Sequence, residues 1–313
     1  MKKVLKVFSV VLLLVSMINI TGCKKEEKSN KITIMATSFP GYDVARAITK
    51  ESNNIEVKML LKPGSETHVY EPTPKDIKNI NNSKLFIYVG GDSDEWVSDI
   101  LKNINTKKTK VVKLIDLVDL VKEEEVEGME EHDEEEEEED DEHVWTSPKN
   151  YIEIINKIKE EIVKIDNDNK ELYEKNANNY INELNGIDKE IRDIVKNSKR
   201  KELLFGDRFP LRYFTDEYKL KYYAAFPGCS EQTEASAKTI AFLSKKVRED
   251  KIPVVLHIEL SNGKIANTIA KETGAKVLEF NSAHNITQKD FDNNITYIDL
   301  MKRNIKVLKE ALN

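Results

Sequence analysis

Histidines are the residues of this 313-residue chain whose type best suits metal chemistry, and there are five of them. Imidazole is among the side chains that bind divalent transition metals best. His143 stands just before Val144-Trp145-Thr146-Ser147-Pro148, where Ser147 is suited to cap a helix and Pro148 to begin it. We therefore expect the helix start to hold His143 in a fixed position. Considered alone, it is better explained as a surface histidine at the end of a charged segment.

His68 stands in a second stretch that ends in a helix start. Residues 61–74 read Leu-Lys-Pro-Gly-Ser-Glu-Thr-His-Val-Tyr-Glu-Pro-Thr-Pro and follow a predicted strand. In open α/β sheets, ligands bind beyond the carboxyl ends of the strands. His68 is therefore placed where a binding site is expected.

His257 lies in an alternating apolar segment, residues 254–260, that predicts a strand. A period of two places His257 and Glu259 together on one face of this strand. Near the carboxyl end of the strand, both side chains could reach a cleft. A buried His257 that bonds Glu259 or the backbone explains the pattern equally well. We expect Glu259 to orient an imidazole, without binding metal itself.

Short strands alternating with helices would position these histidines. We predict strands at 32–36, 55–61, 85–89 and 111–115, and again at 202–205, 222–226, 254–260 and 276–280. This alternation is typical of parallel sheets covered by helices. The predicted fold is α/β, with two lobes that each contain a four-stranded, mostly parallel sheet.

The helical block between the two sets of strands predicts a rigid connection. Tyr151–Ile165 forms one predicted helix, and apolar residues at steps of three and four then continue for about thirty residues, or about 45 Å. The chain is divided accordingly into a signal peptide at 1–22, a tether at 23–30, an N-terminal lobe at 31–122, an acidic loop at 123–142, the helix after His143 at 143–167, a long linker helix at 168–198 and a C-terminal lobe at 199–313.

The net charge of −7 is dominated by one segment. Residues 123–142 contain sixteen Asp or Glu and no Lys or Arg. Because like charges repel, we expect a disordered loop that enriches cations weakly without forming a dedicated site. The rest of the chain has no RNP pattern, zinc-finger spacing or basic stripe, which argues against nucleic-acid binding.

The N-terminus predicts export. Three lysines precede an apolar run, Val7–Ile20, that is too short to span a bilayer comfortably. Ile20-Thr21-Gly22-Cys23 resembles a bacterial lipobox, which implies cleavage before Cys23, lipidation of its thiol and anchoring at the extracytoplasmic face of the cytoplasmic membrane. The alternative is a secreted protein with an incidental cysteine. Cys229 is the only other cysteine, so no internal disulfide is expected in the mature chain.

The segments around His68 and His143 closely resemble the two metal-ligand segments of the zinc and manganese substrate-binding proteins of ABC importers. The similarity extends over nearly the whole mature chain. It implies a non-catalytic, monomeric carrier that holds a metal in the cleft between its lobes and delivers it to an ABC permease.

The second lobe departs from the pattern of that family. Arg208 stands where the family usually has a ligand, five residues before Tyr213, and a guanidinium cannot bind a cation. The adjacent Asp207 is a possible substitute or supporting carboxylate. Asn281 stands near the place of the family's last acidic ligand, and we expect His284, three residues later, to supply the missing imidazole.

The expected ligands are therefore His68, His143 and His284, with His257 as the other contender. Three imidazoles with one carboxylate or water suit Zn²⁺, whereas Mn²⁺ would favour more oxygen ligands. Arg208 also raises the possibility of an anionic metal chelate as cargo. A secreted zinc enzyme is the rival class, but no His-Glu-x-x-His or Gly-x-Ser-x-Gly motif is present.

The lipobox predicts that a radioactive fatty acid will label the mature protein through Cys23. Cys23→Ser should abolish the label, whereas Cys229→Ser should leave it unchanged. Label that persists in Cys23→Ser would contradict the assignment.

Overall fold

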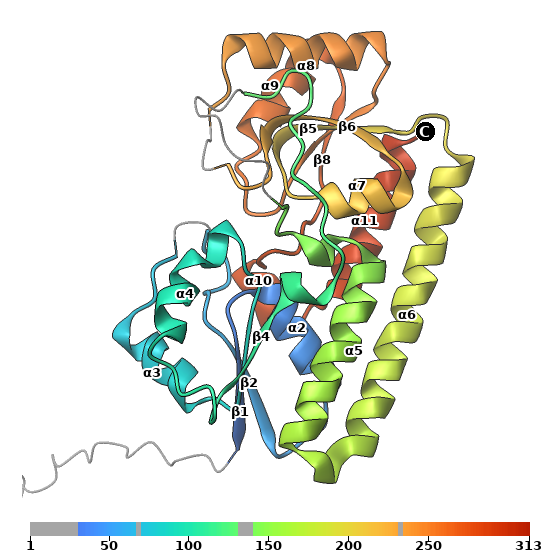
Figure 1. Cartoon of the computed structure of the whole chain (residues 1–313). Coiled ribbons are helices and arrows are strands. Elements are labelled where there is room, and N and C mark those ends of the chain that lie inside the picture. Colours follow the sequence, from blue (N-terminus) through green and yellow to red (C-terminus); the bar gives the residue numbers. More distant parts are fainter. Residues whose placement is uncertain (1–30, 67–69, 131–139, 231–233) are drawn as a thin grey trace, which may run out of the picture. The chain divides into compact units, whose positions relative to one another are not determined.

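The structure of this chain is a computed structural model that describes residues 31–66, 70–130, 140–230 and 234–313. Residues Ile32–Asn313 form one compact unit. Cys23 and His68 lie outside the described residues, as does His132. Within the described unit, two parallel sheets form the two lobes that the sequence predicts (Figure 1).

The first lobe contains a sheet with the strand order β2-β1-β3-β4, in which all neighbours are parallel. Met35 and Phe86 face α3 and α4, whereas Ile34 and Ile87 face the core shared with α2. Helices therefore cover both faces, as the apolar strands require. The elements of this lobe are β1 (Ile32–Ala36), α2 (Phe39–Ile48), β2 (Ile55–Met59), α3 (Pro74–Asn82), β3 (Leu85–Tyr88), α4 (Glu95–Leu101) and β4 (Lys110–Lys113).

The second lobe repeats this arrangement with the order β6-β5-β7-β8, again all parallel. Two of its strands differ from the prediction by more than one residue: β5 continues to Phe209, and β7 ends at His257 instead of Leu260. Its elements are β5 (Glu202–Phe209), α7 (Arg212–Tyr218), β6 (Lys221–Pro227), α8 (Ala237–Glu249), β7 (Val254–His257), α9 (Lys264–Thr273), β8 (Lys276–Glu279), α10 (Gln288–Asp292) and α11 (Tyr297–Ala311).

Two long helices, α5 (Pro148–Ile165) and α6 (Lys170–Asn197), connect the lobes. Ser147 caps α5 by accepting a bond from the Asn150 N–H, with Pro148 at the first position, as predicted. The 28 residues of α6 extend about 42 Å and pack against α2 of the first lobe and α11 of the second (Figure 1). One hydrophobic core therefore continues through both lobes.

A buried carboxylate ties these helices together. The Asp43 side chain is fully buried and accepts hydrogen bonds from the Tyr180 hydroxyl at 2.5 Å and the Tyr151 hydroxyl at 3.3 Å. Arg46 lies 2.6 Å from the same carboxylate and also donates to the Ile295 carbonyl of the second lobe. This network fixes α2 against α5, α6 and the segment before α11.

The acidic segment is not a disordered loop in its described parts, and the prediction for residues 123–130 and 140–142 was wrong. The Glu130 N–H bonds the Ala225 carbonyl of β6, and Met129 is buried. The Gly228 N–H donates to Glu123 at 2.8 Å, while Asp141 and Glu142 are buried. Burial of Met129 and hydrogen bonds from backbone N–H groups thus offset the repulsion between the carboxylates of this segment. Residues 131–139 lie outside the described part.

Among the described residues, no helix has the length and apolar character needed to cross a membrane.

The network around Asp43 predicts a large loss of stability in Asp43→Ala. The substitution leaves the half-buried Arg46 without its carboxylate and should lower the free energy of unfolding by about 3 kcal/mol, measured by urea denaturation. Asp99→Ala, which breaks an exposed pair with Lys102, is the control and should have no measurable effect. A loss below about 1 kcal/mol for Asp43→Ala would contradict this role.

Candidate metal site

Glu142, His143 and His284 converge at the boundary between the lobes. One ligand atom from each lies within 4.8 Å of the others, and all three residues are buried. The His143 and His284 ring centroids are 5.3 Å apart, and the His143 Nε2 atom lies 3.9 Å from Glu142 Oε1. Zinc ligands at about 2.0–2.1 Å in a tetrahedron are about 3.3 Å from one another, so small side-chain movements would bring these atoms onto one ion.

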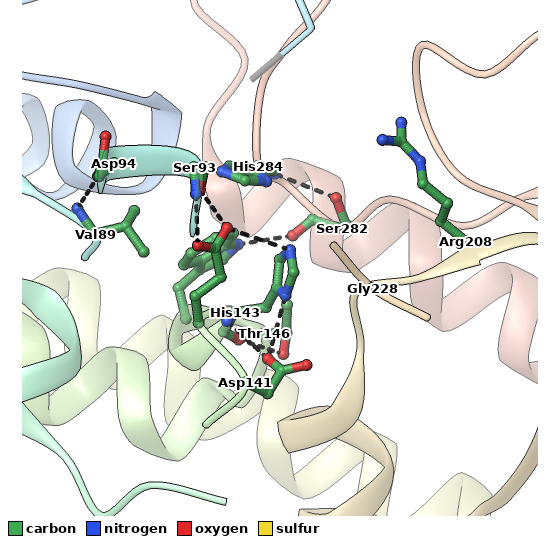
Figure 2. Close-up of polar contacts among 12 residues, drawn as sticks. Val89, Ser93, Asp94, Asp141, His143, Thr146, Arg208, Gly228, Ser282 and His284 are labelled. Atoms are coloured by element: carbon green, nitrogen blue, oxygen red, sulfur yellow. Dashed lines mark hydrogen bonds and ion pairs between the residues drawn. The ribbon is translucent and has the colours of Figure 1, made fainter. Parts of the chain in front are cut away.

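His143 is oriented by the carboxylate two residues before it. Asp141 Oδ1 accepts the His143 backbone N–H at 2.8 Å and lies 3.2 Å from ring Nδ1 (Figure 2). When Nδ1 carries the proton for this bond, the lone pair of Nε2 faces Glu142, where a metal would bind. Sequence reasoning did not assign a role to Asp141, although its Asp-x-His spacing was a usable signal.

Glu142 is the ligand candidate that the sequence analysis missed, because it lies within the acidic run. Its carboxylate accepts the Ser93 N–H at 3.0 Å and also the Ser93 hydroxyl. A Cβ at Gly91 would lie 2.6 Å from Glu142 Oε2, so this approach requires glycine there, at a φ of +89°. The first lobe therefore holds Glu142 in place.

The electrostatics of this site favour a bound cation. Burial raises the pKa of Glu142 to about 7, although His143 and Ser93 oppose the shift. Burial alone would lower the pKa of His143, but the carboxylates of Asp141, Glu142 and Glu123 outweigh it and raise that pKa above its ordinary value. An incoming metal ion would displace the proton on His143 and take over its role in balancing the carboxylates.

His284 is presented by a tight turn of the second lobe. Ala283 has a φ of +60°, an uncommon conformation for a residue with a side chain. Glu259 accepts the Ser282 N–H at 2.6 Å, the Ser282 hydroxyl at 2.7 Å and the His284 N–H at 3.2 Å. Glu259 thus supports the loop that carries His284.

The Trp145 ring packs against both imidazoles. Its ring centroid lies 4.8 Å from that of His284 and 5.4 Å from that of His143. The Trp145 indole N–H donates to the Ser282 carbonyl at 2.9 Å. The Tyr297 hydroxyl donates to the backbone carbonyl of Trp145 at 2.8 Å. Packing on Trp145 restricts both rings.

The remaining predicted residues lie elsewhere around the site. His257, the last residue of β7, lies 2.9 Å from the Ile258 carbonyl through Nδ1 and is not part of the three-residue cluster. Asp207 accepts the backbone N–H groups of Arg208 and Ile258, which ties β5 to the end of β7. Asn281 is bonded to Asn304 of α11.

Arg208 lines the same cavity as the two imidazoles but is not one of the three converging residues. Its guanidinium is 2.9 Å from the Glu66 carboxylate.

Gly228 packs closely on His143, since a Cβ at Gly228 would lie 3.2 Å from the His143 ring. Cys229 is half-buried, and burial raises the pKa of its thiol well above the usual range, so it stays protonated.

The architecture of two α/β lobes around a histidine–carboxylate site is that of a two-lobed binding protein, and comparisons with known proteins agree. The family model described as "Zinc-uptake complex component A periplasmic" matches residues 34–311. The chain is 33% identical over 289 residues to the high-affinity zinc uptake system protein ZnuA of Bacillus subtilis, covering 92% of this chain and 89% of that protein.

A second relative is the zinc-binding lipoprotein AdcA of Streptococcus pneumoniae, which is 30% identical over 93% of this chain. The chain spans only 58% of its length. The structure of the Zn(II)-bound ZnuA-like domain of that protein superposes with a TM-score of 0.75 at 29% identity, covering 90% of this chain and 99% of that domain.

The chain therefore belongs to the ZnuA family of zinc substrate-binding proteins of ABC importers. This family binds metal for transport and is not an enzyme family.

The hydrogen bond between Asp141 and the His143 ring predicts that Asp141 contributes to metal affinity. Asp141→Ala should weaken zinc binding about tenfold to a hundredfold, because Nδ1 loses the partner that orients the ring. Asp166→Ala is the matched control, since it removes a buried carboxylate that bonds Tyr173 far from the site. Competition with a zinc chelator measures both affinities. Equal affinities for the two variants would show that Asp141 does not orient His143.

Proposed function

We propose that this protein captures zinc between its lobes and passes it to the permease of an ABC importer. The observation that supports this function best is the convergence of Glu142, His143 and His284 on one buried point. Imidazole nitrogens and a carboxylate oxygen form a ligand set that Zn²⁺ prefers. Its family relatives carry names that refer to zinc uptake and zinc binding.

His68 is proposed as the fourth ligand. It follows β2 in the sequence, and the described part of the loop before it reaches the cavity through Ser65 and Glu66. Four protein ligands would close the coordination sphere, and a closed sphere leaves no position for a reacting water. We therefore infer that the protein carries the ion without catalysis.

Zinc is favoured over manganese and over a metal chelate. Two imidazoles and one carboxylate offer fewer oxygen ligands than Mn²⁺ prefers. An anionic chelate would need a positive group in the cavity, and the Arg208 guanidinium already bonds Glu66 in a bidentate arrangement. Its charge is thus balanced within the protein.

The proposed location is the extracytoplasmic face of the cytoplasmic membrane. Lipidation of Cys23 would anchor the protein there, and residues 24–30 would serve as a short polar tether. We propose that it acts as a monomer, because the ligands of the site all come from one chain.

A variant series with purified protein tests the ligand set. His143→Ala, His284→Ala and His68→Ala should each weaken zinc binding tenfold or more in titration calorimetry, whereas His257→Ala should bind like the wild type. Metal analysis of protein purified without added metal should find about one zinc per chain. If His284→Ala retained full affinity and His257→Ala lost it, the ligand from the second lobe would be His257.

A further inference from the structure

Residues 62–66 of the first lobe, here called the rim loop, are held against the second lobe by the side chain of Asn285. The amide nitrogen of Asn285 donates to the Lys62 carbonyl at 3.1 Å and to the Ser65 carbonyl at 2.7 Å. The Gly64 N–H donates to the Ile286 carbonyl at 2.7 Å. Three hydrogen bonds therefore join the rim loop to the segment that directly follows His284.

The orientation of the Asn285 amide is itself fixed. Its oxygen accepts the Ile286 N–H at 2.8 Å, which leaves the NH₂ group directed to the rim loop. Asn285 is buried. Because the two donors of one amide satisfy two carbonyls, the rim loop cannot separate from the second lobe without losing both bonds.

Arg208 of β5 forms an ion pair that holds the end of the rim loop. Arg208 Nη2 lies 2.9 Å from Glu66 Oε2, and Nη1 lies 3.4 Å from Oε1. Nη1 also donates to the Ser230 carbonyl at 3.3 Å. Two parallel bonds between a guanidinium and a carboxylate specify geometry as well as attraction.

Both attachments lie at the metal cavity. The lining of this cavity includes Ser65, Glu66, Arg208 and Asn285 together with the two imidazoles of His143 and His284. The cavity has a volume of about 30 Å³, and residues of both lobes form its wall. Because Ser65 and Glu66 are part of this wall, movement of the rim loop would widen the cavity for a zinc ion.

We propose that Asn285 and Arg208 are positioning residues that clasp the rim loop over the cavity, and that zinc enters and leaves when this clasp opens. The inference rests on the proposed function for the identity of the cargo. It gives Arg208 a role at a position where it cannot bind the metal itself. The clasp joins the lobes only at the cavity, whereas the continuous core around α6 keeps the rest of the two lobes fixed.

Zinc-exchange kinetics of the full chain test this proposal. Asn285→Ala and Arg208→Gln should each raise both the association and the dissociation rate of zinc by about tenfold in stopped-flow measurements, because an open rim loop eases passage in both directions. Higher salt should speed exchange in the wild type and have a smaller effect in Arg208→Gln, whose ion pair is already absent.

Two substitutions serve as matched controls. Asn176 of α6 donates from one amide to the Ile48 and Lys50 carbonyls at 3.1 and 2.7 Å, the same arrangement far from the cavity. Arg303 forms a bidentate pair with Asp290 within the second lobe. Asn176→Ala and Arg303→Gln should leave both zinc rates unchanged.

Hydrogen exchange of the Gly64 amide tests the clasp without zinc. This amide should be protected in the wild type and in Asn176→Ala, and should exchange faster in Asn285→Ala. Protection that survives in Asn285→Ala overturns the proposal, as does an association rate that stays the same in both clasp variants. If the wild type bound no zinc, the proposed function would fail, while Gly64 exchange would still decide whether Asn285 holds the rim loop.

Discussion

The constraint on which this structure depends is the accumulation of buried carboxylates around one imidazole at the boundary of the lobes. Asp141 and Glu142 are buried beside His143, and Glu123 contributes to the same field. Buried negative charge is costly unless a cation or a network of donors balances it. Ser93 and backbone N–H groups meet part of this need, and the raised pKa of His143 shows that positive charge is favoured at this point. We propose that a divalent ion on Nε2 supplies that charge.

The scaffold around this charge is stiff, and the parts that touch the metal cavity are loops. A single core continues from the first sheet through α5 and α6 into the second, and the Asp43 network fastens the helices to one another. Large hinge opening would disrupt this core. Movement at the site is therefore more easily provided by the loop attachments of Asn285 and Arg208. We infer that a rigid core combined with a rim loop that can detach allows the protein both to bind zinc tightly and to exchange it.

The fold was predictable from the sequence because local signals and topology agree. Alternating apolar runs gave all eight strands, and Ser147-Pro148 gave the start of α5. The end of β7 was not predictable, since apolar alternation continues to Leu260 after the strand hydrogen bonds stop at His257. The packing of residues 123–130 was also hidden, because the donors that satisfy its carboxylates come from distant segments such as Gly228.

The site was partly predictable. Residue type together with the resemblance to the metal-binding family identified His143 and His284 as candidates, and the structure brings these two together. Glu142 was hidden by its acidic neighbours, because only the fold shows that Ser93 and Gly91 create a niche for its carboxylate. The function of Asn285 depends on a contact with the first lobe, more than two hundred residues earlier in the chain, and composition or periodicity carries no signal for such a contact.

A crystal structure of the zinc-loaded protein, with the ion located by its anomalous scattering, tests most directly whether imidazoles of both segments and Glu142 hold one metal ion. We expect one strong peak about 2.0–2.2 Å from His143 Nε2, a ring nitrogen of His284 and a Glu142 carboxylate oxygen. A principal peak bound by His257 instead, or by carboxylates of residues 123–142 without His143, would contradict it.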